Sequence, residues 1–221
     1  MVRDQVERRG VRDQRVLDCM ARVLREQFVP GAATSAYDDR ALPIEAGQTI
    51  SQPYIVARMT ELLGVEPGDR ILEIGTGSGY QAAILACLGA TVVTIERHAE
   101  LGKSAVERLA RLGVTGVEVR VGDGSWGDPG GAPWDGIIVT AGAPAIPEPL
   151  RLQLAVGARL VIPVGPRYQQ DLLVVERRAE EDWADWSDGP VVFVPLVGEG
   201  GWAEGGGREG VRREGDRREG G

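Results

Sequence analysis

Five short apolar runs are spaced along the middle of the chain, and each has about the length of a buried strand. Their content of Val, Ile and Leu is typical of strands that are covered on both faces. They occupy residues 71–74, 91–95, 117–121, 136–140 and 159–164. Helical segments are expected between several of them, over residues 81–86, 99–112 and 148–154. This alternation predicts a parallel sheet with helical connections.

Two more apolar runs, at residues 172–176 and 190–196, follow without a helix between them. An acidic segment with Trp183 and Trp186 separates the two runs, and we interpret it as a turn. Neighbouring strands without a crossover connection form an antiparallel hairpin. The predicted fold is therefore α/β: a Rossmann-like, doubly wound, mostly parallel sheet of seven strands with an antiparallel hairpin at one edge.

The chain before the first core strand is expected to be mainly helical. Residues 4–26 have a helical apolar face that Gly10 interrupts, and residues 31–47 are expected to form an ordered loop. Another helix is expected from Pro53 to Leu63, with Ser51 as a candidate N-cap and Gly64 at its end. We therefore divide the chain into an N-terminal helical extension, a core and a tail, at residues 1–64, 65–202 and 203–221.

Composition narrows the possible classes of function. The chain has 221 residues, of which 43% are hydrophobic, enough for one α/β domain with a full core. The net charge of −8 argues against a nucleic-acid-binding surface, which needs clustered Lys and Arg. No apolar run approaches the length of a membrane span and the N-terminus is charged, so we expect a cytoplasmic protein. The tail is nearly all Gly, Arg and acidic residues, and we expect it to be disordered.

Cysteine and histidine usage offers little chemistry. Cys19 and Cys87 lie among apolar neighbours in predicted helices, and we expect both to be buried free thiols in a reducing compartment. No second Cys or His stands at ligand spacing, so no metal site is expected. His98, the single histidine, is expected at the surface or at the rim of a cofactor site.

A glycine-rich turn follows the first core run. Gly75, Gly77 and Gly79 alternate with Thr76 and Ser78, and a helix is expected directly after them. A dinucleotide fingerprint requires a small residue at its last position, where this chain has Tyr80. The pattern is instead Gly-x-Gly-x-Gly with Glu73 just before it, and it resembles motif I of the S-adenosylmethionine-dependent methyltransferases. The alternative is a plain turn between a strand and a helix.

Two acidic residues stand at the ends of the next strands. Glu96 closes the second run, about 20 residues beyond the glycines, where a carboxylate can accept hydrogen bonds from both hydroxyls of a ribose. A solvated surface charge is the alternative for Glu96. Asp123 lies between Gly122 and Gly124 at the end of the third strand, where a methyltransferase would hold the adenine amino group. An ordinary turn is the alternative, because Asp and Gly dominate turns.

Taken together, these segments resemble the protein-L-isoaspartate O-methyltransferase family over residues 5–202. The block from Thr49 to Pro53 is the specific part, whereas the glycine motif fits any class I methyltransferase. Further matches lie in residues 9–17, 28–30, 36–44, 73–81, 96–97, 122–124, 137–144, 160–165 and 193–198.

The resemblance implies an enzyme that methylates the free α-carboxylate of L-isoaspartyl residues and so starts their repair to aspartate through a succinimide. It implies S-adenosyl-L-methionine as cofactor, isoaspartyl proteins and peptides as partners, and no metal. Ser51 would be the catalytic hydroxyl. The cofactor residues would be Thr49, Ile50, Glu73, Gly75, Thr76, Gly77, Ser78, Gly79, Tyr80, Glu96, Arg97, Asp123, Gly124 and Thr140.

Two other functions stay open at this point. One is a carboxyl methyltransferase for an Asp of a single dedicated peptide partner. The other is a non-catalytic module that binds S-adenosylmethionine, which the joint presence of Ser51, Glu96 and Asp123 argues against. We expect a monomer that binds neither nucleic acid nor membrane.

Overall fold

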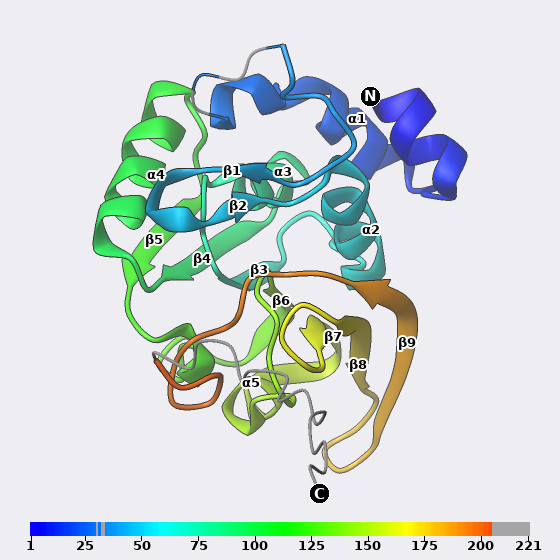
Figure 1. Ribbon diagram of the computed structural model, residues 1–221. Helices are drawn as coiled ribbons and strands as arrows, with labels where there is room; N and C mark the ends of the chain where they lie inside the picture. Colours follow the sequence, from blue (N-terminus) through cyan, green and yellow to red (C-terminus); the bar gives the residue numbers. More distant parts are fainter. Residues whose placement is uncertain (30, 32–33, 205–221) are drawn as a thin grey trace, which may run out of the picture.

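The computed structural model describes residues 1–29, 31 and 34–204, and its centre is one twisted sheet of seven strands (Figure 1). The strand order is β5-β4-β3-β6-β7-β8-β9. β3 to β7 run parallel, whereas β8 is antiparallel to both of its neighbours. The strands are β3 (Arg70–Ile74), β4 (Thr91–Glu96), β5 (Val117–Val121), β6 (Trp134–Val139), β7 (Leu154–Val164), β8 (Gln170–Arg177) and β9 (Trp183–Val191). The predicted mostly parallel sheet is confirmed.

Alternating side chains of the strands face two separate apolar cores. Ile71 of β3 belongs to a core that α1 (Gln14–Arg22), α2 (Pro53–Leu63), α3 (Tyr80–Cys87) and α4 (Ala99–Arg111) cover. Leu72, its neighbour, belongs to the core on the other face, where α5 (Glu148–Leu152) lies. The chain therefore winds outward in both directions from β3 and β6, and the carboxyl ends of these two strands form the crevice in which such sheets bind ligands.

The N-terminal extension is more broken than its apolar pattern predicted. Gly10 does interrupt it, with a φ of 108°. The helix after it, α1, begins only at Gln14, where the Asp13 side chain caps it, and it ends at Arg22 rather than near residue 26. Short helical turns flank α1: η1 (Val2–Val6), η2 (Glu7–Arg9) and η3 (Arg25–Phe28).

The segment expected as a loop between residues 31 and 47 contains a small antiparallel ribbon. β1 (Leu42–Pro43) pairs with β2 (Thr49–Ile50) across the turn η4 (Glu45–Gly47). Figure 1 shows this ribbon stretched between α4 and α2, and an ion pair joins Arg108 of α4 to Glu45. The ribbon leads directly into α2, so it fixes the residues that precede this helix.

The last strand lies earlier in the chain than predicted. We expected a turn around Trp183 and Trp186 and a strand over residues 190–196, but β9 spans Trp183–Val191 and contains both tryptophans. An edge strand tolerates acidic side chains on its solvated side, so the acidic residues here do not mark a turn. The two indole rings face opposite apolar cores. The chain after Val191 leaves the sheet and crosses the carboxyl ends of the strands (Figure 1).

The prediction that both cysteines are free thiols is wrong. Cys19 of α1 and Cys87 of α3 form a disulfide bond, with their Cα atoms 5.8 Å apart. Local spacing did not reveal the pair because 68 positions separate the two residues, and only the packing of α1 on α3 brings them together. The N-terminal extension is thus tied covalently to the core.

Most of the predicted tail, residues 205–221, lies outside the described residues. Ala203 and Glu204 are described, and Glu204 forms an ion pair of 2.6 Å with Arg97. Among the described residues, no helix is both long and apolar enough to cross a membrane.

Candidate active site

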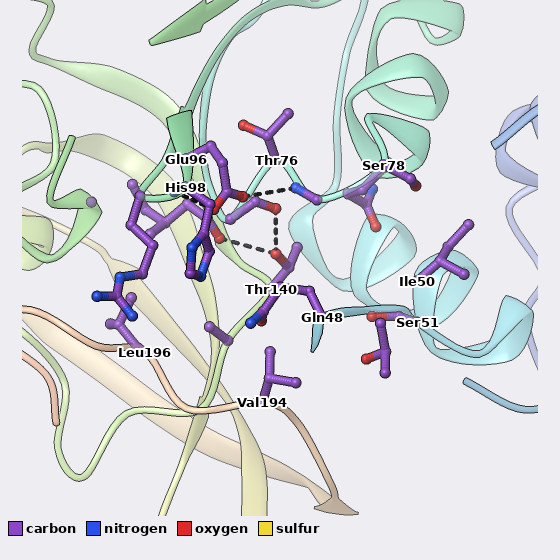
Figure 2. Close-up of a pocket in the computed structure, with 18 of the residues that line it drawn as sticks. Gln48, Ile50, Ser51, Thr76, Ser78, Glu96, His98, Thr140, Val194 and Leu196 are labelled. Carbon is purple, nitrogen blue, oxygen red and sulfur yellow. Dashed lines mark hydrogen bonds between the residues drawn. The ribbon is translucent and has the colours of Figure 1, made fainter. Parts of the chain in front are cut away.

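A cavity of about 250 Å³ opens at the carboxyl ends of β3, β4 and β6 (Figure 2). Six segments remote in sequence form its wall: the residues before and within α2, the glycine turn with its flanking residues, the end of β4, Gly124 after β5, the end of β6 and the chain after β9. Twelve of the fifteen predicted site residues line it: Thr49, Ile50, Ser51, Gly75, Thr76, Gly77, Ser78, Tyr80, Glu96, Arg97, Gly124 and Thr140. Glu73, Gly79 and Asp123 do not.

The glycine turn lies close to the end of β6, and this requires the absence of side chains. Gly75 has a φ of 96°, and a Cβ at this position would collide with the Thr140 hydroxyl. That hydroxyl donates a hydrogen bond of 2.6 Å to the Gly75 carbonyl (Figure 2). The turn is also held from α4, where Arg108 donates to the Ser78 carbonyl at 2.9 Å. A rigid turn therefore leaves its backbone open toward the cavity.

Glu96 closes one side of the cavity with a nearly buried carboxylate, 5% exposed. One oxygen accepts a hydrogen bond of 3.0 Å from the Gly77 N–H, and the other accepts one of 3.0 Å from the His98 N–H. Each oxygen of a carboxylate can accept a second hydrogen bond. The carboxylate is thus fixed in position and keeps acceptor capacity for two donors of a ligand, as two neighbouring hydroxyls would supply.

Glu73 lies under the glycine turn and is completely buried. Burial raises the pKa of its carboxyl group to about 8; the adjacent Thr94 hydroxyl opposes this rise and the Glu96 carboxylate adds to it. Among the described residues, neither carboxyl oxygen has a hydrogen bond of ordinary geometry. Near neutral pH, Glu73 is therefore a neutral acid behind the wall of the cavity, and its side chain does not line the cavity.

Asp123 is occupied by the chain that follows β9. One carboxylate oxygen accepts hydrogen bonds from the Ser125 N–H and hydroxyl, and the other accepts one from the Glu199 N–H at 2.8 Å. Partial burial opposes ionisation, but these hydrogen bonds together lower the pKa of Asp123. Asp123 thereby secures the segment that covers the cavity, while the neighbouring Gly124 lines it.

Gly79 shapes the site from behind the turn. It is the N-cap residue of α3 with a φ of 84°, in the left-handed region that favours glycine. A Cβ there would touch the Leu109 side chain of α4 at 3.4 Å. Gly79 therefore lets α3 start close to α4 without reaching the cavity itself.

Ser51 does not cap the helix that follows it. The N-cap position of α2 belongs to Gln52, and no side chain caps this end. Among residues 1–29, 31 and 34–204, the Ser51 hydroxyl has no hydrogen-bond partner. Figure 2 shows Ser51 and Ile50 on one side of the cavity and Glu96 and His98 on the other. The hydroxyl is therefore free to bind a ligand.

Sequence reasoning missed the segment of residues 194–197, which forms another part of the wall (Figure 2). We had assigned residues 194–196 to the last strand. Pro195 lacks a backbone N–H, and together with Gly198 it was the available sign that regular pairing ends here. Isolated bridges join Pro195 to Gly142 and Val197 to Trp202 instead. His98 lines the cavity too, in keeping with its expected place at a rim. The other lining residues were not predicted as ligand contacts: Gln48, Val56, Met59, Ile74, Gln81, Ile95 and Ala141.

Comparisons of the sequence with known proteins all indicate the same family. A family model described as protein-L-isoaspartate(D-aspartate) O-methyltransferase matches residues 1–201. A protein-L-isoaspartate O-methyltransferase of Methanoculleus marisnigri is 55% identical over 204 residues, which cover 91% of this chain and 92% of that protein. One of Methylorubrum populi is 54% identical over 198 residues, covering 89% of this chain and 93% of that protein.

Solved structures give the same result. A structure named protein-L-isoaspartate O-methyltransferase superposes with a TM-score of 0.82 at 27% identity, covering 91% of this chain and 67% of that one. A putative enzyme of this name from Plasmodium falciparum, in complex with S-adenosyl-L-homocysteine, superposes with a TM-score of 0.76 at 25% identity, covering 89% and 96% of the two chains. The chain therefore belongs to the protein-L-isoaspartate(D-aspartate) O-methyltransferase family.

Proposed function

We propose that this protein transfers a methyl group from S-adenosyl-L-methionine to the free α-carboxylate of L-isoaspartyl residues. The observation that carries the proposal is the composition of a single cavity. It combines a glycine turn and a fixed carboxylate, which suit an adenosyl cofactor, with the unengaged hydroxyl of Ser51 on another side. The family membership and the relatives' names point to the same reaction.

The chemistry of the wall supports one arrangement of the cofactor in the cavity. Gly75, Gly77 and Tyr80 would surround the methionine portion. Glu96 would accept hydrogen bonds from both ribose hydroxyls, and Gly124 would lie against the adenine. Glu73, Gly79 and Asp123 act from behind the wall in this proposal. The remaining contacts would come from Thr49, Ile50, Thr76, Ser78, Arg97 and Thr140.

The reaction needs alignment rather than a strong base. An α-carboxylate is ionised at pH 7 and is itself the nucleophile. One of its oxygens forms a bond to the methyl carbon while the bond from that carbon to the sulfonium sulfur breaks, and the sulfur keeps the electron pair. The protein must hold oxygen, carbon and sulfur in line and exclude water. This fits a site in which Ser51 is the only candidate catalytic side chain that we assign.

Two groups near Ser51 suit an anionic substrate. The Ser51 hydroxyl can donate to the carboxylate oxygen that does not attack, which orients the nucleophile without protonating the attacking oxygen. The N-terminus of α2 begins two residues later, at Pro53, and its unpaired N–H groups carry partial positive charge. Together they favour a carboxylate on this side of the cavity.

The methyl ester formed would close to a succinimide faster than the free acid, which makes the reaction the first step of repair to aspartate. We propose isoaspartyl proteins and peptides as partners, a monomer as the working unit and the cytoplasm as the compartment. The proposed chemistry assigns no role to a metal. Among the described residues, no group of three or more His, Cys, Asp or Glu side chains is arranged to hold one.

The test is methyl transfer from radiolabelled S-adenosylmethionine to a short peptide that carries isoaspartate, with the matching aspartyl peptide as control. We expect label on the isoaspartyl peptide alone, and release of that label as methanol at mildly alkaline pH. Equal label on both peptides would contradict the proposed specificity. Absence of label in protein that binds S-adenosylhomocysteine would contradict the proposed activity and favour a dedicated partner or a binding module.

A further inference from the structure

The residues around Ser51 receive their support from outside the cavity. Gln52, which follows Ser51, donates a hydrogen bond from its side-chain Nε2 to the backbone carbonyl of Asp39 at 2.9 Å. Asp39 lies ahead of the β1–β2 ribbon, and Gln52 is the N-cap residue of α2. The Ser51–Gln52 turn is thus tied to the loop at Asp39 rather than to the glycine turn beneath the cofactor site.

Arg9, at the end of η2, contacts both the loop at Asp39 and the first turn of α2. Its Nη1 lies 2.7 Å from the Oδ2 of Asp39. Its guanidinium carbon lies 3.7 Å from the centre of the Tyr54 ring, in the first turn of α2. A planar guanidinium can pair with a carboxylate and stack on an aromatic face at the same time, which a lysine cannot do equally well. Arg9 therefore fixes the distance between the Asp39 loop and the start of α2.

Asp39 is also constrained from the interior. Its other oxygen, Oδ1, is buried and has no hydrogen-bond partner among the described residues. Arg25 is completely buried nearby and donates from Nε to the carbonyl of Ala36 at 2.8 Å. Burial lowers the pKa of Arg25 to about 10, and the Asp39 carboxylate opposes this shift, so Arg25 remains a cation at neutral pH. Asp39 thus lies between one buried and one partly exposed cation.

These contacts affect the position of Ser51 more than they affect the stability of the fold. The Arg9 and Asp39 side chains are 45% and 24% exposed, and ion pairs with this much solvent contribute little to folding. Yet the loop, the N-terminal extension and α2 meet here, directly beside Ser51. A displacement of about 1 Å at a reacting group can lower a rate by about 100-fold. The effect of losing Arg9 should therefore appear in catalysis before it appears in stability.

We propose that Arg9 is a positioning residue, which acts through Asp39 and Tyr54 to hold the Ser51 hydroxyl toward the cavity. Arg9 does not line the cavity and touches neither cofactor nor substrate in this proposal. The inference rests on the proposed function, because Ser51 matters only if a substrate carboxylate binds there.

Arg8 provides a matched control, because it is the adjacent residue with the same side chain and a different contact. Its Nη1 lies 2.8 Å from the carboxylate of Asp4, within the N-terminal segment, and both side chains are more than 60% exposed. Arg8→Ala therefore removes the same charge and the same number of atoms without breaking the link to Ser51.

The experiment compares the full chain with Arg8→Ala, Arg9→Ala and Arg9→Lys, using the isoaspartyl peptide at saturating S-adenosylmethionine. We expect Arg9→Ala to lower kcat for the peptide about 10-fold, with the Kd for S-adenosylhomocysteine and the midpoint of thermal unfolding equal to those of Arg8→Ala. Arg9→Lys should recover part of kcat, because it keeps the ion pair and loses the stacking. In a double-mutant cycle that combines Arg9→Ala with Asp39→Asn, kcat of the double variant should be no lower than kcat of Arg9→Ala alone.

The outcomes separate this inference from the function on which it rests. A wild-type protein without peptide methylation would contradict the proposed function itself. An active wild type with equal kcat for Arg9→Ala and Arg8→Ala would overturn the role of Arg9. Equal losses for Arg9→Ala in kcat, cofactor affinity and thermal stability would also overturn it, because they would make Arg9 a general structural residue.

Discussion

Glu96 shows at the level of one residue how the fold fixes a carboxylate in the wall of the cavity. Its carboxylate is nearly buried, and the two backbone N–H groups of Gly77 and His98 offset the cost of that burial. The same hydrogen bonds define where each oxygen points. The residue was recognisable in the sequence from its distance to the glycines, because a strand end and a turn joined by one helix have few possible arrangements.

Replacing Glu96 by Gln should weaken cofactor binding about 10- to 100-fold, since hydrogen bonds to a charged group are worth about 1.5–3 kcal/mol. The amide would also turn an N–H₂ group toward one of the two backbone N–H donors. Titration calorimetry with S-adenosylhomocysteine measures the effect, and the exposed Glu100 serves as control through Glu100→Gln. An affinity unchanged by Glu96→Gln would refute the ribose assignment.

Glu73 makes a prediction about pH. The pKa of its carboxyl is about 8 in the folded protein and about 4.5 when unfolded, so the folded state binds more protons between these values. The free energy of unfolding therefore falls as pH rises from about 4.5 to 8, by at most about 1.4 kcal/mol per pH unit from this group. Glu73→Gln should remove this fall.

Urea unfolding between pH 5 and 8 measures this term as the difference between Glu73→Gln and the wild type. The difference should grow in favour of the variant as pH rises. Glu100→Gln, which alters an exposed carboxylate on α4, should leave the pH dependence close to that of the wild type. A difference that is constant with pH would mean that Glu73 is already ionised in the folded protein.

At the scale of elements, a helix or strand could be predicted when residues within it or directly beside it mark its ends. α2 was predicted to its ends because Pro53 and Gly64 mark both of them. β9 was misplaced because an acidic edge strand and an acidic turn have similar composition, and only its pairing with β8 distinguishes them. The ribbon of β1 and β2 was missed because strands of two residues carry no periodic pattern.

The segment after β9 shows the functional consequence of that error. Its hydrogen bonds go to Asp123 and Gly142 instead of to a neighbouring strand. Once this segment leaves the sheet, it becomes part of the cavity wall. The role first considered for Asp123 changes with it, from a ligand contact to a residue that secures the covering segment.

At the scale of the whole molecule, the sequence indicated the parts and the topology determined how they meet. Apolar runs with helices between them predicted the doubly wound sheet, and the residues at strand ends predicted much of one site. The sequence did not predict contacts between distant segments, including the disulfide bond between Cys19 and Cys87. This bond closes the chain across the N-terminal extension, the ribbon and the glycine turn.

Reduction of this disulfide should lower the free energy of unfolding by about 2–4 kcal/mol, because the unfolded chain regains the freedom of a 68-residue loop. Urea unfolding with and without dithiothreitol measures the difference. The double variant Cys19→Ala with Cys87→Ala should unfold identically in both conditions. A wild type whose stability does not respond to complete reduction would show that the bond does not constrain the unfolded chain.

The central claim is that one cavity binds the cofactor through the glycine turn and Glu96, and orients the substrate carboxylate through Ser51. Ser51→Ala tests it most directly, with Kd for S-adenosylhomocysteine and kcat for the isoaspartyl peptide measured on the same preparation. Ser187→Ala, at an exposed serine of β9, is the control. The account predicts a kcat at least about 10-fold lower, as expected for losing one hydrogen bond to a charged group, with Kd within about twofold of the wild type. An equal loss of kcat and of affinity for S-adenosylhomocysteine, or no loss of kcat, would contradict it.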